Sequence, residues 1–373
     1  MSASERTKIV IASTLKPLKD ARAYYRFALS LRETNKYDIN IIGFLNKNEQ
    51  DEQNVTFHSI FQSDRSNFKR LSLGFKFLKL LLKLKPQVMI VTTFELLPAA
   101  VFFKIIKNVK LIYDVQENYA LNVKYSVVNS KVFKTIGNYF IKLIEGCSNR
   151  FIDEYIFAEK CYAKEFPTID NYTILENKFP KEKQDFVPVK FELGSSLTFL
   201  ITGTLTPLYG TLEAIHWFKA LLEVNPSHQL LIKGHVPIES FLNILKNEVR
   251  SIKQIRLLLS STPLPFSEIL NAYNETDIVL LPYQQLPNIS PKFPSKLFEC
   301  LALGKVFLAS PNDDWKKVAN SYQAGFCIDF SNNDDINQIL DLIYSTNFYE
   351  NGMDDFPLWT MNDSRKLESL IEQ

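Results

Sequence analysis

Two kinds of hydrophobic pattern alternate along this chain. Short continuous apolar runs are typical of strands buried in a parallel sheet, and apolar residues recurring every three or four positions are typical of helices. Helices are predicted at Ala21–Thr34 and Phe68–Leu84. In the first half the predicted strands are Lys8–Ala12, Ile39–Phe44, Val88–Thr92, Lys110–Tyr113, Tyr155–Phe157 and Tyr172–Leu175.

The same alternation restarts in the second half. The strands predicted there are Leu197–Thr202, Gln229–Lys233, Ile255–Leu259, Asp277–Leu281, Val306–Ala309 and Phe326–Ile328. Between the two sets, Lys178–Ser196 contains two prolines and a glycine and is the best linker candidate. We therefore expect an α/β protein with two Rossmann-like, doubly wound domains facing a cleft, at residues 1–185 and 186–354. A helix at about 355–373 is expected to pack back on the first domain.

Composition excludes several classes of protein. The chain has 373 residues, of which 46% are hydrophobic, so it can bury two cores. No apolar run reaches the ~18 residues of a membrane-spanning helix, and Met1–Lys8 lacks the apolar core of a signal peptide. The four cysteines and four histidines show no metal-ligand spacing. We expect a cytoplasmic protein with no metal and no resident cofactor.

The formal net charge of +2 is the sum of two halves of the chain whose net charges have opposite signs. Residues 1–190 hold 30 Lys and Arg and 20 Asp and Glu, whereas residues 191–373 hold 13 and 21. The whole chain is therefore not a strongly basic nucleic-acid binder, but its first half suits an anionic partner. The basic excess is densest at residues 67–85, where lysines interleave with Phe and Leu. This stretch is either a peripheral contact with the inner face of the cell membrane or a packed helix whose lysines reach solvent.

The clearest local motif is LITGTLTPLYGT, residues 200–211. A buried strand ends at Gly203, and a short loop with Thr204 and Tyr209 leads to Gly210 and a helix. Glycines let the backbone approach a ligand, and helix N-termini attract phosphate. The alternative is an ordinary strand-to-helix turn. A second strand ends at Lys233 and Gly234, where the ammonium either meets a phosphate or is a solvated loop charge.

A third motif is FPSKLFECLALGKVFL, residues 293–308. Ser295 follows a proline at the start of a predicted helix. Lys296 and Glu299 are three residues apart and share one helix face. A cation and a hydrogen-bond acceptor there suit a phosphate and a vicinal diol. The alternative is an exposed ion pair.

Three polar residues follow a first-half strand: Asp114, Gln116 and Glu117. A carboxylate at a strand end can accept a proton from a hydroxyl group, and Gln116 can hydrogen-bond a hydroxyl of a ligand. The alternative for Asp114 is a helix cap.

Together these motifs resemble GT-B glycosyltransferases, specifically glycosyltransferase family 4. LITGTLTPLYGTLEAI, LLIKGHVP, DIVLLPY and PSKLFECLALGKVF look like that family's donor-binding domain. In the first half, KPLKDARAYYRFALSL is similar to the family's Asp-x-Arg loop through Asp20 and Arg22. KLIYDVQEN is similar to its Asp-x-His-Glu segment, and ILENKFP to the turn that closes its first domain.

The resemblance implies transfer of a sugar from a nucleotide-diphosphate donor, without a divalent metal and with retention of configuration. It places Glu299 on the donor ribose, Lys296 and the Gly203–Gly210 loop on the pyrophosphate, and Asp20 and Arg22 on the acceptor side. This chain departs from the family at Pro291, where a Glu is usual, at Gln116, where a His is usual, and at Thr204–Tyr209, which has no cation. Lys292 is a candidate replacement cation.

We therefore expect a hexosyltransferase-type enzyme that acts on a saccharide or lipid-linked acceptor in cell-surface polysaccharide biosynthesis. Two alternatives stay open. One is a catalytically silent GT-B scaffold or partner subunit that binds nucleotide, and the other is a nucleotide-sugar epimerase of similar two-domain shape.

Overall fold

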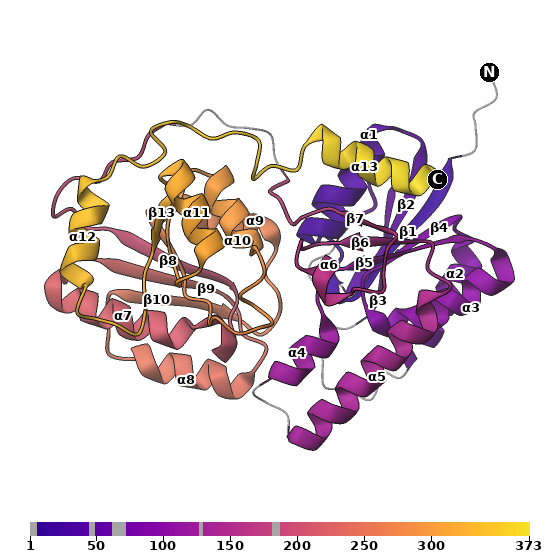
Figure 1. The fold of residues 1–373 in the computed structure, drawn as a ribbon, viewed down its shortest axis with the longest axis horizontal. Coiled ribbons are helices and arrows are strands. Elements are labelled where there is room, and N and C mark those ends of the chain that lie inside the picture. The colour runs from indigo at the N-terminus through magenta and orange to yellow at the C-terminus, as the bar shows by residue number, and fades with distance from the viewer. Residues whose placement is uncertain (1–5, 45–48, 62–71, 127–129, 181–186) are drawn as a thin grey trace. The chain divides into compact units, whose positions relative to one another are not determined.

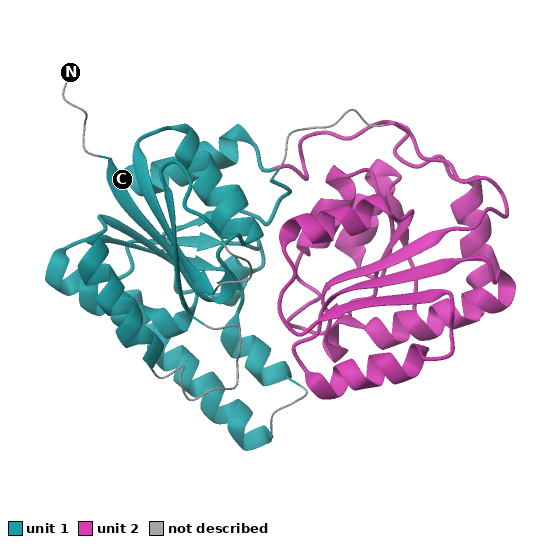
Figure 2. Cartoon of the chain, turned by 180° about the vertical axis from the view of Figure 1, so that it is seen from behind, with its two compact units in different colours: residues 1–180, 359–373 teal, residues 181–358 magenta. Residues whose placement is uncertain are grey.

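The computed structural model describes residues 6–44, 49–61, 72–126, 130–180 and 187–373. The chain divides into two compact units, residues 1–180 with 359–373 and residues 181–358 (Figure 2). The domain boundary expected at 185/186 and the residues 67–71 of the basic stretch lie outside the described residues.

Unit 1 is built on a seven-stranded parallel sheet in the order β3-β2-β1-β4-β5-β6-β7 (Figure 1). Its strands are β1 (Thr7–Pro17), β2 (Tyr37–Phe44), β3 (Val55–Phe61), β4 (Val88–Val91), β5 (Lys110–Val115), β6 (Glu154–Phe157) and β7 (Tyr172–Ile174). The strand order reverses between β1 and β4, as in a doubly wound sheet. Six of the seven strands were predicted, whereas the edge strand β3 was missed.

The helical elements of unit 1 cover both faces of this sheet. They are η1 (Ala21–Ala28), α1 (Leu29–Glu33), α2 (Leu73–Leu84), η3 (Phe94–Leu96), α3 (Leu97–Lys107), α4 (Tyr119–Tyr125), α5 (Lys131–Asn149), α6 (Tyr162–Glu165) and α13 (Met361–Glu372). The predicted helix at Ala21–Thr34 corresponds to the π-helix η1 continued by α1.

Two apolar clusters lie on opposite faces of the unit 1 sheet. One contains residues of α2, α3 and α6, and the other contains residues of η1, α1 and α13. Leu367 and Leu370 of α13 belong to the second cluster together with Ile9 and Phe27. The C-terminal helix therefore completes the core of unit 1.

Unit 2 has a six-stranded parallel sheet in the order β10-β9-β8-β11-β12-β13. Its strands are β8 (Thr198–Thr204), β9 (Gln229–His235), β10 (Ile255–Ser260), β11 (Ile278–Leu281), β12 (Val306–Ala309) and β13 (Gly325–Cys327). Its helical elements are η4 (Pro207–Tyr209), α7 (Thr211–Val224), α8 (Glu239–Val249), α9 (Phe266–Asn274), α10 (Ser295–Ala302), α11 (Asp313–Tyr322) and α12 (Ile336–Ser345). The strand order again reverses, here between β8 and β11, which is where doubly wound sheets bind ligands.

Candidate functional site

The switch point of unit 2 brings two of the sequence motifs into contact. Gly203 lies near the end of β8 with a φ of +99°, a conformation that favours glycine. A Cβ built on Gly203 would lie only 2.2 Å from Lys296 Nζ. The amine of Lys296 on α10 therefore rests directly over the backbone at Gly203. A cation, a backbone segment without a side chain and the first turn of α10 therefore lie next to one another.

Gly210 and Gly234 allow close packing of the backbone. Gly210, with a φ of +66°, lies so close to β11 that a Cβ there would be 1.7 Å from the carbonyl oxygen of Pro282. A Cβ on Gly234 would be 2.3 Å from the carbonyl oxygen of Gly203. Gly234 therefore allows β9 to approach the loop that carries Gly203.

Glu299 is buried in unit 2 with only 7% of its surface exposed. Its Oε2 accepts a hydrogen bond of 2.6 Å from the hydroxyl of Tyr273. Burial, reinforced by the charge of Glu299, raises the pKa of Tyr273, so Tyr273 remains a donor. The alternative of an exposed Lys296–Glu299 ion pair is wrong, because the two side chains contact different partners.

The remaining donor-side candidates are spread around the same strand ends. Thr204 and Tyr209 line a small cavity together with Lys296, and the Tyr209 ring meets Tyr283 edge-on at 5.4 Å. Lys233 is half-buried on β9, and Ser295 is the first residue of α10. Lys292 is half-buried, and its carbonyl oxygen accepts a hydrogen bond of 2.9 Å from Trp315 Nε1.

In unit 1 the dominant polar feature is a buried ion pair. Asp114 lies in β5 with no exposed surface, and its carboxylate accepts hydrogen bonds of 2.6–3.1 Å from the Nε and Nη2 of Arg22. Arg22 Nη1 donates to the carbonyl oxygen of Leu175 at 2.8 Å and to Asn177 Oδ1 at 3.1 Å. The Asp-x-Arg loop, β5 and the turn after β7 are thus joined through one guanidinium.

This geometry corrects the expectation for Asp114. Both oxygens are occupied, because Gln116 Nε2 also donates to Asp114 Oδ2 at 2.9 Å. Asp114 is therefore not free to act as a base in this conformation. It is not a helix cap either, since the cap of α4 is Asn118, whose Oδ1 accepts from Leu121 N. In this structure the Asp114 carboxylate holds the side chains of Arg22 and Gln116.

The other unit 1 candidates have distinct surroundings. Asp20 caps the π-helix η1 by accepting from the backbone N–H groups of Arg22 and Ala23 at 2.9 and 3.1 Å. Glu117 is half-buried, and its Oε2 accepts a hydrogen bond of 3.0 Å from Asn122 Nδ2. Of the two carboxylates predicted to be catalytic, Glu117 is the one with exposed surface.

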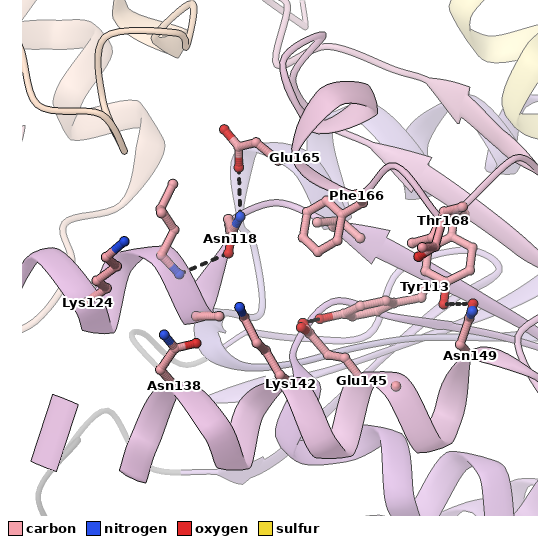
Figure 3. Close-up of a pocket in the computed structure, with 16 residues that line it drawn as sticks. Tyr113, Asn118, Lys124, Asn138, Lys142, Glu145, Asn149, Glu165, Phe166 and Thr168 are labelled. Atoms are coloured by element: carbon pink, nitrogen blue, oxygen red, sulfur yellow. Dashed lines mark hydrogen bonds between the residues drawn. The ribbon is translucent and has the colours of Figure 1, made fainter. Parts of the chain in front are cut away.

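Unit 1 also contains a pocket that the sequence reasoning missed (Figure 3). Its volume is about 510 Å³, which is within the usual range for small-molecule sites. Aromatic rings of Tyr113, Tyr155 and Phe166 line it, and Lys124, Asn138 and Lys142 lie at one end. Asn138 Oδ1 is buried and has no hydrogen-bond partner among the described residues. Such a pocket combines apolar surface with an acceptor oxygen that a ligand can satisfy.

Glu145 on α5 lines the same pocket and accepts a hydrogen bond of 2.9 Å from the hydroxyl of Tyr113. Burial raises the pKa of Glu145 from 4.5 to about 7. No sequence motif marks this residue. Its position depends on α5 packing against β5.

Glu145 is expected to make the stability of the protein fall as the pH rises. The unfolded chain releases this proton at about pH 4.5 and the folded chain at about 7. The stabilisation is therefore complete below pH 4.5 and is lost as the pH rises through about 7, with a total change of about 3 kcal/mol. Urea unfolding of the wild type and Glu145→Gln across this range measures it. An identical pH dependence in both proteins would contradict the assignment.

The described part of the chain holds no group of three His, Cys, Asp or Glu side chains arranged to bind a metal ion. None of the described helices is long and apolar enough to cross a membrane.

Comparison with known proteins identifies the second unit. Residues 183–353 match the model of the family described as glycosyl transferases group 1. Unit 2 is similar to the group 1 glycosyltransferases over these residues. No curated protein matches the chain in sequence.

Solved structures show that the whole chain has the GT-B fold. Sucrose-phosphate synthase from Thermosynechococcus elongatus matches with a TM-score of 0.62 at 11% identity, covering 98% of this chain and 94% of that one. HepE from Anabaena in complex with UDP-glucose matches with a TM-score of 0.58 at 12% identity, covering 99% and 98%. UDP-GlcNAc 2-epimerase from Neisseria meningitidis bound to UDP-GlcNAc matches with a TM-score of 0.60 at 12% identity, covering 99% and 100%.

These neighbours include a sucrose-phosphate synthase and an epimerase, so the shared fold does not decide between sugar transfer and epimerisation. The group 1 family match favours the transferase, as the motifs predicted. All the donor-side residues named above fall within the matched residues 183–353.

Proposed function

We propose that this protein transfers a sugar from a nucleotide-diphosphate sugar to a hydroxyl-bearing acceptor. The observation that carries the proposal is the amine of Lys296 over the backbone of Gly203, inside a group 1 glycosyltransferase domain. A diphosphate leaving group needs positive charge and N–H donors at this place. Lys296, Gly203 and the first turn of α10 supply them.

The donor is proposed to lie across the ends of β8 and β11. Glu299, held by Tyr273, accepts from the ribose hydroxyls, and Lys296 binds the pyrophosphate. The uracil base is favoured because two structural neighbours are complexes with UDP-glucose and UDP-GlcNAc. Tyr209, Lys233, Lys292 and Ser295 surround this position as further donor contacts.

The reaction is proposed to need no metal and to retain configuration. The bond from the sugar to the diphosphate breaks, the acceptor oxygen bonds to the sugar, and the acceptor proton passes to the leaving diphosphate. Lys296 and the N-terminus of α10 neutralise the developing charge. No protein nucleophile is required in this scheme, which agrees with the engagement of Asp114 by Arg22.

Unit 1 is proposed to hold the acceptor, a saccharide or lipid-linked saccharide of cell-surface polysaccharide biosynthesis. The pocket beside α5 supports this, because aromatic faces combined with amide, hydroxyl and carboxyl groups suit a sugar. Arg22 and Asp20 shape the neighbouring loop, and Glu117 is the accessible carboxylate near α4. We place the enzyme in the cytoplasm, peripheral to the inner face of the membrane.

The donor assignment is tested with Glu299→Gln, which keeps a side-chain oxygen to accept from Tyr273 while removing the charge. We expect the Kd for UDP, measured by calorimetry, to rise roughly tenfold, because a charged acceptor is replaced by a neutral one. Glu275→Gln is the matched control, since Glu275 is exposed and pairs with Arg256. Equal affinities for wild type and Glu299→Gln would remove the ribose contact from the proposal.

A second candidate function is a nucleotide-binding scaffold without turnover. Two observations favour it: Pro291 stands exposed where the resembled family has a glutamate, and Asp114 is occupied. Tight UDP-sugar binding without hydrolysis or transfer identifies the scaffold. Conversion of the donor sugar to another configuration without an acceptor identifies the epimerase.

A further inference from the structure

Helix α5 carries a stripe of exposed apolar side chains. Its exposed side chains include Val132, Phe133, Ile136, Tyr139, Phe140 and Leu143, and Phe133 and Tyr139 are 72% and 70% exposed. These positions recur at the helical period and form one stripe.

The inward side of α5 packs with Ile141 and Ile144 and also carries small and polar residues. Gly137 approaches Val123 of α4, and Glu145 binds Tyr113. Ser148 is buried. A surface helix normally has apolar side chains on its packed face only. The outward stripe therefore exposes apolar side chains that are not packed against the rest of the protein.

Two neighbouring helices extend this surface. Helix α3 contacts both α2 and α5 (Figure 1). Phe75 and Leu82 of α2 and Phe102, Ile105 and Ile106 of α3 are also exposed. Eleven of the nineteen large apolar side chains that are exposed in the described part of the chain belong to these three helices. We refer to these eleven side chains and the lysines between them as the α2-α3-α5 face.

The charge of this face has one sign. The three helices contain eight lysines and a single acidic residue, Glu145, which points into the pocket. Lys76, Lys79 and Lys83 on α2, Lys107 on α3 and Lys131 on α5 are exposed, and Lys142, which is also exposed, lines the pocket. Aromatic and aliphatic side chains interleaved with lysines match the boundary between lipid headgroups and acyl chains.

We propose that the α2-α3-α5 face docks on an anionic lipid bilayer, lying in the headgroup region without crossing the membrane. A second copy of this chain fits less well, because a two-fold contact through this face would bring lysines against lysines. The inference deepens the peripheral location in the proposed function. It also assigns most of the contact to α5 and α3, beyond the basic stretch at 67–85 that the sequence singled out.

The test is co-sedimentation of the full chain with vesicles, without donor or acceptor. We expect the protein to pellet with vesicles of phosphatidylcholine and phosphatidylglycerol in equal parts, to stay in solution with phosphatidylcholine alone, and to be released by salt. The double variant Phe133→Ser/Phe140→Ser should lower the partition coefficient roughly tenfold or more. Lys79→Glu/Lys83→Glu should abolish the preference for anionic vesicles.

The matched control is Val224→Ser/Ile244→Ser, which removes two exposed apolar side chains from unit 2 and should leave partitioning unchanged. UDP binding, measured on every variant, reports an intact unit 2 independently of the membrane. The proposal is overturned if the wild type ignores anionic vesicles, if neutral vesicles bind it equally well, or if the control variant loses binding as the α5 variant does. The wild type could instead form a dimer in gel filtration and fail to bind vesicles. If Phe133→Ser/Phe140→Ser then dissociates that dimer, the face binds a second copy of the chain and the proposal is overturned.

Discussion

Replacing Lys296 with alanine is expected to lower the rate of sugar transfer by roughly two to three orders of magnitude. The amine lies over the backbone at Gly203, where the proposed diphosphate leaving group gains charge as its bond to the sugar breaks. A cation that meets charge developing in the transition state should affect kcat more than the affinity for the donor. Steady-state kinetics with a UDP-sugar, together with the Kd for UDP, separates the two effects.

Two further variants sharpen this prediction. Gly203→Ala should reproduce much of the loss, because the added Cβ would occupy a point 2.2 Å from the Lys296 amine and displace it. Lys317→Ala removes an exposed lysine of the same unit that pairs with Asp314, and it should leave turnover unchanged. Full activity in Lys296→Ala would exclude this lysine from the leaving-group site.

Replacing Arg22 with methionine is expected to destabilise unit 1 by about 3–5 kcal/mol. Methionine keeps much of the side-chain volume, but it leaves the fully buried carboxylate of Asp114 without its cation. The carbonyl oxygen of Leu175 also loses its donor. Urea or thermal unfolding of the full chain measures the change.

The double variant Arg22→Met/Asp114→Asn separates positioning from catalysis. We expect it to recover part of the lost stability, because the uncompensated buried charge is gone. If Asp114 only positions the loop, the refolded double variant should retain measurable transfer. A stable double variant with no activity at all would instead restore Asp114 as a catalytic residue.

The strands of both units could be predicted because a buried parallel strand is a local apolar run. Ile39–Phe44 and Val306–Ala309 lie within β2 and β12, as expected. The missed strand β3 pairs only with β2 at the sheet edge, and several of its residues are polar or half-buried. A strand of this kind has no continuous apolar run to reveal it.

The candidate site was predictable as separate motifs, but its contacts were not. Helix and loop signals marked Gly203 and Lys296 individually, whereas their close approach depends on how α10 packs beside β8. The pairing of Arg22 with Asp114 joins residues 92 positions apart, so local pattern left Asp114 as a base or a cap. The pocket beside α5 was missed because Tyr113 lies in β5 and Glu145 in α5. Only tertiary packing brings these two side chains into contact.

The path of the chain through the two units has a consequence for biosynthesis. Unit 2 is inserted between Pro180 and Trp359 of unit 1, and Leu367, Leu370 and Ile371 of α13 are buried in the core of unit 1. During translation, residues 181–358 can emerge and fold as one continuous segment. The core of unit 1 remains incomplete until α13 has left the ribosome. A nascent chain arrested before Met361 therefore carries a complete unit 2 beside an incomplete unit 1, and a chaperone can protect the exposed apolar surface of unit 1.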